Sequence, residues 1–336
     1  MERNWKFDFL KGISCIIVVF LHCPLYGLLG DAVIYALRFS VPIFFMISGY
    51  FCNDRDIPYL WKHFLKLLRI IVITEGCYLV WYLLRSYFFN EKGIWDALKE
   101  CEFALHPIRT VLRGSFFNGT LWYLYAAMWT YILLIILQKA GILQKTHVIL
   151  TVSLVLMTVL VVGRYYIQTH YDINDYIYWL MNAVGFGLPL TLWGMVLGRF
   201  ENKIVEKVKL WQALGITFLG FVMIVIEYFV SREYMDFHFS TLVIVTGFFM
   251  LCFVLKCELA GILKPFVYIG RELSMYIYLV HFFFVTLFGE LAGVWNLEEN
   301  LAFEVAKPIL VCILSVLTAM VIPKAKRNCT IRKKAL

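Results

Sequence analysis

A histidine lies inside the first strongly apolar segment of the chain, and a lysine precedes it on the same helical face. His22 follows Lys11 by eleven residues, which is three helical turns with a small remainder. The two side chains are therefore expected to lie roughly 16 Å apart along one helix. An ionisable group in hydrocarbon costs several kcal/mol unless it is paired or hydrated, so by default it marks a functional site. We interpret the lysine cation and the buried proton acceptor as two ends of a substrate site.

Two neighbouring residues refine this hypothesis. Pro24 lacks a backbone N–H and crowds the carbonyl four residues earlier, so it predicts a loosened helix and a water-accessible pocket beside His22. Asp8 lies near the start of the same face and is expected to pair with Lys11 rather than to contact His22. The alternative is a structural histidine bonded to a neighbouring helix. We favour the functional interpretation because intramembrane ionisable groups are rare.

Another histidine lies in the apolar segment before the last one. Ser274, Tyr278 and His281 are spaced i, i+4 and i+7, so they share one face of a helix. A polar stripe in a membrane helix is expected to face the interior of a helical bundle. This pattern fits a functional site and interhelical hydrogen bonding equally well.

Three further polar residues lie within apolar segments. Arg38 is near the outer end of the second segment, where its expected role is to extend its charge to the interface. Ser48 precedes Gly49, and two small residues in succession predict a close helix contact. Glu75 lies about seven residues inside the third segment, an expensive place for a carboxylate. A cation or an imidazole is a candidate partner for Glu75, which alone specifies no function.

A basic face precedes the third apolar segment. Lys62, Lys66 and Arg69 recur at i, i+4 and i+7, which places them together at the cytoplasmic mouth of the protein, on the same side as Lys11. Lysine and arginine bind phosphates well, so one interpretation is a phosphate clamp. The other is that these cations only determine topology.

The composition identifies the class of protein. Of the 336 residues, 62% are hydrophobic and 16% are charged, which is typical of a polytopic membrane protein and excludes a soluble globular domain. The expected fold is therefore all-α with about ten membrane-spanning helices. The apolar segments that predict them lie at about residues 10–29, 33–52, 68–89, 120–138, 146–163, 181–198, 211–229, 239–255, 273–292 and 303–323.

The distribution of charge predicts the topology. Most of the 31 lysine and arginine residues fall on one side when the apolar segments alternate, and the positive-inside rule makes that side cytoplasmic. Both termini are then cytoplasmic, and the net charge of +8 reflects topology rather than a nucleic-acid partner. The nine cysteines include no CxxC pair, so neither a disulfide framework nor a metal site is predicted.

No linker divides the apolar part of the chain. We therefore predict one integral-membrane domain over residues 1–323 and a basic cytoplasmic tail over 324–336, near anionic lipid. The longest break, 90–119, is expected outside the cell and has helical spacing of apolar residues, which predicts an amphipathic interfacial helix. Two interpretations of this segment remain: it is a lid over the helical bundle, or it is part of a groove that binds the acceptor.

Four stretches of the chain carry a combined pattern. The first contains a basic residue and a histidine, the second reads Phe-Phe-Met-Ile-Ser-Gly, the third surrounds Trp122, and the fourth contains the Ser/Tyr/His stripe. They lie at residues 7–22, 44–51, 121–124 and 269–281. In order and spacing they resemble the integral-membrane acyltransferase-3 family, which modifies bacterial surface glycans and related acceptors.

The resemblance implies an enzyme that moves an acyl group, expected to be acetyl, from cytoplasmic acyl-CoA to a hydroxyl of an extracytoplasmic polysaccharide or lipid-linked sugar. The family's basic residues are matched here by Lys11, Lys66 and Arg69, and with Lys62 they would hold the phosphates of the coenzyme. His22 would act as general base or briefly carry the acyl group, and we prefer the general base. The family commonly has arginine where this chain has Lys11 and Lys66, which keeps the charge but loses a bidentate fork.

The remaining expectations concern supporting residues, partners and location. No bound cofactor is expected, because acyl-CoA is a substrate, and the expected location is the bacterial plasma membrane as a multi-pass protein. A homo-oligomer and a separate extracytoplasmic transferase stay open. A transporter or flippase of an amphipathic solute is the alternative function, since ten helices and a buried histidine also fit it. The residues expected to support catalysis or bind the acceptor are Asp8, Arg38, Ser48, Glu75, Trp122, Ser274, Tyr278 and His281.

Overall fold

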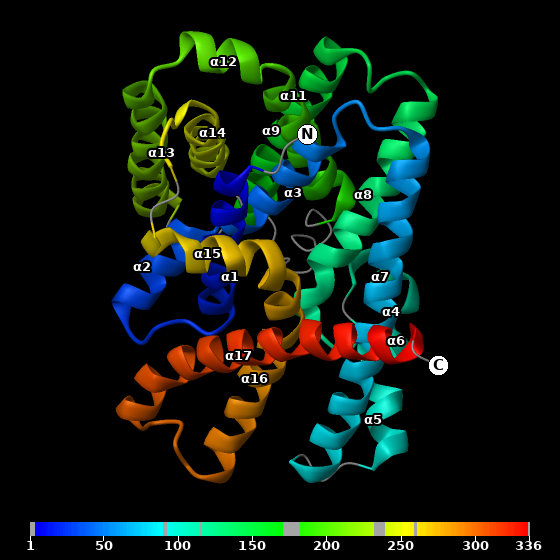
Figure 1. Cartoon of the computed structure of the whole chain (residues 1–336). Helices are drawn as coiled ribbons and strands as arrows, with labels where there is room; N and C mark the ends of the chain where they lie inside the picture. Colours follow the sequence, from blue (N-terminus) through cyan, green and yellow to red (C-terminus); the bar gives the residue numbers. More distant parts are fainter. Residues whose placement is uncertain are drawn as a thin grey trace. The chain divides into compact units, whose positions relative to one another are not determined.

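The structure, a computed structural model, describes residues 4–89, 93–114, 116–170, 182–231, 239–258 and 261–334. Every regular element in these residues is a helix, which confirms the all-α class (Figure 1). The longer helices are α1 (Trp5–His22), α2 (Leu28–Leu37), α3 (Ser40–Cys52), α4 (Ile57–Phe88), α8 (Trp122–Lys139), α9 (Thr146–His170), α11 (Leu188–Arg199), α13 (Leu210–Ser231), α14 (Phe239–Val254), α16 (Ser274–Val294) and α17 (Leu301–Lys334). The shorter elements are α5 (Ile94–Glu100), α6 (Glu102–Leu105), α7 (Pro107–Arg113), η1 (Gly119–Leu121), η2 (Ala183–Gly187), α12 (Glu201–Lys207), η3 (Gly261–Leu263), α15 (Lys264–Tyr268) and η4 (Ile269–Leu273).

Seven helical segments of the described residues are long and apolar enough to cross a membrane. An eighth is added if Ala183–Arg199 and Glu201–Lys207, which are bent by 59° at their junction, form one span. Each of the ten predicted apolar segments contains a helix. The chain is therefore a multi-pass membrane protein, while the count of ten spans and the cytoplasmic termini stay predictions.

The chain packs as two compact units. The first joins both ends of the chain, Met1–Ser40 and Lys256–Leu336, and the second contains Val41–Leu255. The predicted site residues in the first unit are Asp8, Lys11, His22, Arg38, Ser274, Tyr278 and His281. Those in the second unit are Ser48, Lys62, Lys66, Arg69, Glu75 and Trp122.

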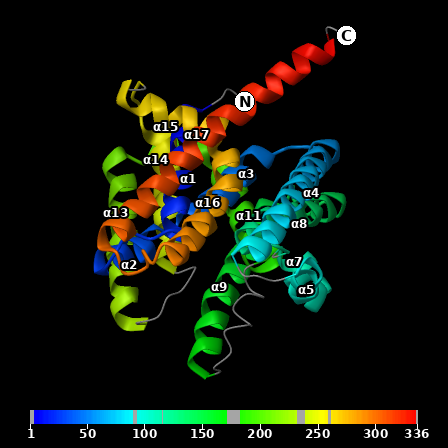
Figure 2. The same ribbon diagram turned by 90° about the horizontal axis from the view of Figure 1, so that it is seen from below.

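In the first unit, α1 packs against α15, η4 and α16, and it also contacts α2 and α17. The last two helices, α16 and α17, pack against each other. Figure 2 shows α17 as one continuous helix that runs to residue 334. This helix crosses the predicted domain boundary at residue 323, and the separation of a tail from the membrane domain stays a prediction.

The predicted first span, residues 10–29, is not one helix. Instead α1 ends at His22, because Cys23 leaves the helical region with φ −139° and ψ 80°. Pro24 follows and cannot donate a helical hydrogen bond, and Gly27 has a φ of +79° that favours glycine. Pro24 therefore lies beyond the end of α1. The prediction that Pro24 loosens a continuing helix is wrong, because α1 does not continue past His22. His22 occupies the last residue of α1.

Two glycines bring α1 into backbone contact with the elements before α16. A Cβ atom at Gly12 would meet the carbonyl oxygen of Phe266, and one at Gly270 would meet the carbonyl oxygen of Asp8. Small residues allow helices in a membrane to approach until their backbones touch, where dispersion replaces the missing hydrophobic driving force. The register of α1 against α15 and η4 is therefore fixed by these two positions.

In the second unit, two glycines bring α3 and α11 into backbone contact in the same way. A Cβ atom at Gly49 would meet the carbonyl oxygen of Thr191, and one at Gly194 would meet that of Met46. The hydroxyl of Ser48 donates to the carbonyl oxygen of Phe44 at 2.8 Å, within its own helix. The close helix contact predicted for the Ser-Gly pair is confirmed.

The start of α4 follows from its sequence. Asp56 caps the helix by accepting a hydrogen bond from the backbone N–H of Tyr59 at 3.1 Å, and Pro58 occupies the first turn. The helix therefore begins more than two turns before the predicted apolar segment at residue 68. This extension places the predicted basic face on the N-terminal part of α4.

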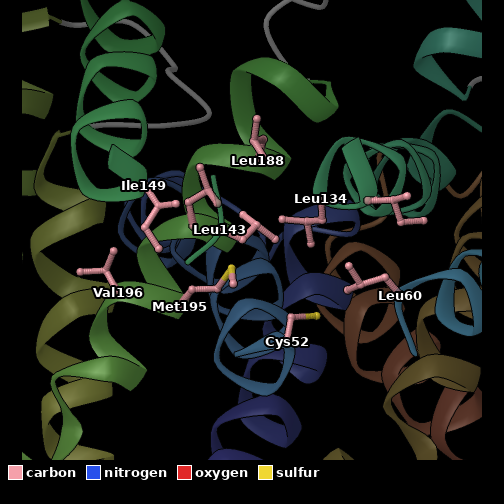
Figure 3. Close-up of a cluster of buried hydrophobic side chains, with 10 residues drawn as sticks. Cys52, Leu60, Leu134, Leu143, Ile149, Leu188, Met195 and Val196 are labelled. Carbon is pink, nitrogen blue, oxygen red and sulfur yellow. The ribbon is translucent and has the colours of Figure 1, made fainter. Parts of the chain in front are cut away.

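The core of the second unit is a cluster of aliphatic and sulfur side chains from α3, α4, α8, α9, α11 and the loop between α8 and α9 (Figure 3). The side chains of such a cluster are close-packed, so replacing any of them with a smaller residue leaves a cavity. Its buried side chains are Cys52, Leu60, Leu134, Ile135, Leu143, Ile149, Leu188, Leu192, Met195 and Val196.

The segment 90–119 does not form one amphipathic helix. Its described residues fold into α5, α6 and α7, followed by the turn η1. Cys101 is extended, with φ −67° and ψ 149°, and Pro107 starts a new helix, so the helical spacing of the sequence is interrupted twice. Gly114 then ends α7 in the left-handed region with a φ of +76°.

Candidate active site

Two histidines from opposite ends of the chain meet in the first unit. The ring centroids of His22 on α1 and His281 on α16 are 5.3 Å apart, with the ring of Phe282 6.3 Å from that of His22. His281 is fully buried, whereas His22 keeps part of its surface exposed. The structure thus brings together the two histidines that the sequence singled out, and only one of them remains open to a substrate.

The helices that carry these histidines run parallel. Gly12 lies against Gly270, and ten residues later His22 lies against His281, which is eleven residues beyond Gly270. The extra residue is accommodated by η4 (Ile269–Leu273), a π-helical turn at the start of α16. Such turns are rare and often occur at functional sites. Without it, the two helices would fall out of register between the glycine contact and the histidine pair.

The hydrogen bond of His281 defines its chemistry. Its Nδ1 atom lies 2.7 Å from the carbonyl oxygen of Tyr278, and a carbonyl only accepts, so Nδ1 carries the hydrogen. In the neutral ring Nε2 is then a bare acceptor. That Nε2 atom is buried and has no hydrogen-bond partner. His281 therefore presents an acceptor in the part of the unit where His22 lies.

The other two residues of the predicted polar stripe on α16, Tyr278 and Ser274, make different contacts. The ring of Tyr278 lies 5.9 Å from that of His281, as their shared face predicted. The hydroxyl of Ser274 instead donates to the carbonyl oxygen of Gly270 at 3.0 Å, and its own carbonyl accepts from the thiol of Cys15 at 3.3 Å. Ser274 therefore joins α1 to α16 through its backbone and does not extend the polar stripe.

An ion pair marks the other end of α1. The Nζ atom of Lys11 lies 2.9 Å from Oδ1 of Asp8, which confirms that Asp8 pairs with the lysine. The side chain of Asp8 is 6% exposed and that of Lys11 is 22% exposed. The carboxylate is thus fixed in the packing, while the ammonium remains accessible.

The expected role of Arg38, to extend its charge to the membrane interface, stays a prediction. Its charge acts electrostatically on His22, and its Nε atom is buried. Arg38 directly follows the last residue of α2 and belongs to the first unit. Of the two histidines, only His22 is affected by this charge.

The basic face of α4 lies in the second unit. Lys62, Lys66 and Arg69 are all exposed, and their i, i+4, i+7 spacing places them on one side of the helix. A surface of this kind can receive a phosphate group without rearrangement of the helix.

Two of the four motif stretches meet in an aromatic cluster of the second unit. The rings of Phe45 and Tyr123 are 4.8 Å apart, and the ring of Phe186 lies 5.8 Å from Phe45 and 5.6 Å from Trp122. Trp122 is half-buried at the start of α8. The stretches at 44–51 and 121–124 thus contact each other, as those at 7–22 and 269–281 do in the first unit.

Glu75 has a different partner from the two candidates. The hydroxyl of Tyr125 donates to Glu75 Oε1 at 3.1 Å. A phenol therefore takes the place of the candidate cation or imidazole. Sequence reasoning missed Tyr125, which bonds to this carboxylate, and Asn118, which caps the turn before α8. The run Asn-Gly-Thr before α8 was a usable signal, because asparagine is a strong helix cap.

A metal site is a separate question. Within the described ranges, no group of three or more His, Cys, Asp or Glu side chains is arranged to hold a metal ion. The donors that the two units offer are imidazole, guanidinium, ammonium, phenol and carboxylate, which suit acid–base chemistry and the binding of phosphates and hydroxyls.

The comparison with known proteins decides the family. Residues 4–323 match the family model of acyltransferase-3, described as an acyltransferase domain. Neither a curated protein nor a solved structure matches the chain. The family match covers nearly the whole chain, and seven helical segments of the described residues are suited to crossing a membrane. The chain therefore belongs to the acyltransferase-3 family and is a multi-pass membrane acyltransferase.

Proposed function

We propose that the protein transfers an acyl group, preferably acetyl, from cytoplasmic acyl-CoA to a hydroxyl of an extracytoplasmic polysaccharide or lipid-linked sugar. The observation that carries this proposal is the contact between His22 and His281 in a chain that belongs to an acyltransferase family. A partly open imidazole next to a fully buried one is suited to general-base catalysis.

In the proposed reaction His22 takes the proton of the acceptor hydroxyl. The hydroxyl oxygen then forms a bond to the thioester carbonyl carbon, the carbon–sulfur bond breaks, and the thiolate of coenzyme A receives the proton from the imidazolium. No proton or electron is gained or lost overall. An acyl-histidine formed on His22 is the alternative, and the general base is preferred because a neutral alcohol needs its proton removed.

We assign His281 as a positioning residue. Its Nε2 acceptor is fixed by the hydrogen bond from Nδ1 to Tyr278, so it is assigned to orient an N–H group of the His22 ring. Arg38 supplies a positive charge that would stabilise the negative oxygen of the tetrahedral intermediate. His22, His281 and Arg38 then divide proton transfer, orientation and charge stabilisation among them.

The donor is proposed to bind through its phosphates. The accessible ammonium of Lys11 and the exposed face of Lys62, Lys66 and Arg69 are the cations assigned to this task. Asp8 would hold Lys11 in place until a phosphate arrives. The acceptor side is assigned to the half-buried Trp122 and to Ser48, with the bacterial plasma membrane as the proposed location.

The test is a transfer assay on membranes that contain the full chain, with isotopically labelled acetyl-CoA and mass spectrometry of the acceptor material. His22→Ala should abolish transfer while insertion and expression stay unchanged. The matched control is His147→Ala, which removes an exposed histidine at the start of α9. Normal transfer by His22→Ala would refute the proposal, and solute movement that ignores acyl-CoA would support a transporter instead.

A further inference from the structure

Three aromatic rings lie beside the basic face of α4 in the second unit. The ring centroid of His63 is 4.2 Å from that of Tyr59 on the same helix and 5.7 Å from that of Tyr131 on α8. The ring planes are 35° and 23° from parallel, respectively. Both tyrosines pack against the hydrophobic core that contains Leu60 (Figure 3). The packing of the unit therefore holds this ring stack of Tyr59, His63 and Tyr131 in place.

The hydrogen bond of His63 leaves one ring nitrogen for a ligand. Its Nδ1 atom lies 2.9 Å from the carbonyl oxygen of Tyr59, and a carbonyl only accepts, so Nδ1 carries the hydrogen. In the neutral ring Nε2 is then an acceptor. His63 is half-buried, so part of its surface is accessible. The group that fits this nitrogen is a hydrogen-bond donor on a ligand.

A guanidinium lies against the same tyrosine ring. The Cζ atom of Arg55 is 5.0 Å from the ring centroid of Tyr59, and its Nε atom donates to the carbonyl oxygen of Phe51 at 3.3 Å. Guanidinium planes stack on aromatic side chains, and nucleic-acid bases stack on guanidinium planes. Arg55 and His63 both contact the ring of Tyr59, so a flat group and a hydrogen-bond acceptor are neighbours on this part of α4.

The cations of the basic face occupy adjacent positions on α4. Lys62 is three residues from Tyr59, and Lys66 is three residues from His63, so these side chains are neighbours on the helix surface. No acidic residue lies between positions 57 and 74 to neutralise them. A polyanion with a flat, hydrogen-bonding group attached therefore complements this surface in both charge and shape. A nucleotide is a ligand of this kind.

We propose that this surface binds the adenine base of the acyl-CoA donor. The 6-amino group of adenine donates to Nε2 of His63, the base stacks on the guanidinium of Arg55, and the phosphates bind the cations of the basic face. The inference rests on the proposed function in one respect, that the donor is acyl-CoA. A 6-oxo purine carries a carbonyl in place of the amine, which would leave two acceptors facing each other.

The experiment compares two ligands that carry the same phosphates. The full chain in detergent is titrated by calorimetry with adenosine 3′,5′-bisphosphate and with inosine 3′,5′-bisphosphate, which differ at the 6-position of the base. The unsubstituted protein should bind the adenosine compound about fivefold more tightly or better. His63→Phe keeps a ring in the stack and removes Nε2, so it should bind both compounds with the lower affinity of the inosine compound.

Two controls separate the base from the phosphates. His147→Phe changes an exposed histidine at the start of α9 and should keep the preference for adenosine. The combined variant Lys62→Gln, Lys66→Gln, Arg69→Gln should weaken the binding of both compounds alike. Thermal unfolding verifies that the variants fold, and the preference of the unsubstituted protein tests the proposal without any substitution.

The proposal is overturned if neither compound binds, if the unsubstituted protein binds both equally, or if the preference survives in His63→Phe. Glycerol phosphate is titrated in parallel. Binding of glycerol phosphate as tight as that of the adenosine compound would mean that the surface recognises phosphate alone, as in a lipid headgroup, and would also overturn it. The transfer assay is scored separately. Preference for adenosine without acyl transfer would reject the proposed function and keep this site, whereas transfer without any base preference would do the reverse.

Discussion

The histidine pair shows how two identical residue types acquire different tasks. His281 is locked by Tyr278 and fully buried, so it can orient a partner but cannot meet a large substrate. His22 lies at the end of α1, partly open, with Arg38 as a charged neighbour. Burial and hydrogen bonding therefore separate the proposed base from the proposed positioning residue.

The role of His281 predicts a partial loss of activity. His281→Ala should lower kcat about tenfold, which corresponds to ~1.4 kcal/mol of transition-state energy. His281→Gln should retain more activity, because its amide oxygen can replace the Nε2 acceptor. By contrast, loss of the base in His22→Ala should cost on the order of 10²–10⁴ in rate. The measurement is kcat and KM for acetyl-CoA, and equal losses in both His281 variants would contradict the role.

The charge of Arg38 predicts a second effect at this scale. Arg38→Gln should lower kcat by about 10²–10³, the range for removal of one group that stabilises an oxyanion. Arg38→Lys should fall between Arg38→Gln and the unsubstituted enzyme, because it keeps the charge but not the planar fork. Rates at saturating acetyl-CoA make the comparison. An Arg38→Gln enzyme with unchanged kcat would remove Arg38 from the mechanism.

At the scale of elements, the decisive feature is the backbone contact between α1 and the start of α16. Gly12→Ala would drive a methyl group into the carbonyl oxygen of Phe266, so α1 must shift and the histidine pair with it. We expect a lower melting temperature and a large loss of transfer. Overpacking of this kind typically costs about 1–3 kcal/mol.

A second glycine provides the control. Gly76 on α4 has nothing within 4 Å of its ideal Cβ position, so Gly76→Ala should be neutral or stabilising by up to about 1 kcal/mol of helix propensity. Thermal unfolding in detergent and the transfer assay are run on both variants. Equal behaviour of the two would mean that the glycine contact does not set the register.

The positions of the helices could be predicted from the sequence. The positions where a helix ends or changes its geometry could be predicted only in part. Hydropathy located a helix in each of the ten apolar segments, because lipid leaves no alternative to internal backbone hydrogen bonding. The end of α1 at His22 was missed, although Pro24 and Gly27 were visible, because the apolar run continues through them. The π-helical turn η4 has no sequence signature of its own, since it results from packing against α1.

Within the candidate site, local pairs were easier to predict than distant ones. The Asp8–Lys11 pair follows from helical spacing alone. The contact of His22 with His281 needed the fold, since nothing local relates their positions. The same holds for Glu75, whose phenol partner comes from another helix. A cation was a candidate there because charge complementarity is the simplest rule for a buried carboxylate.

At the scale of the whole molecule, we propose that the net charge of +8 reflects both the topology of the chain and the binding of donor phosphates. The combined variant Lys62→Gln, Lys66→Gln, Arg69→Gln should raise the KM for acetyl-CoA about tenfold or more, with the KM for the acceptor unchanged. The reason is the loss of phosphate contacts at an exposed face, each of modest energy. Steady-state kinetics on oriented membrane vesicles measures both constants.

The control for this variant removes cations elsewhere. Lys203 and Lys207 are exposed on α12, so the variant with both changed to glutamine tests for a general effect of charge. It should leave the KM for acetyl-CoA unchanged. If both variants raise this KM alike, the basic residues of α4 act only through overall charge.

The first unit is built from the two ends of the polypeptide, and contacting residues such as Cys15 and Ser274 are 259 positions apart. During synthesis, α1 enters the bilayer long before its partner exists. At about 5–20 residues per second, the ribosome needs roughly 13–50 s to reach the second histidine. For most of its translation a nascent chain therefore lacks the histidine pair, and a premature stop anywhere in the second unit leaves His22 without His281.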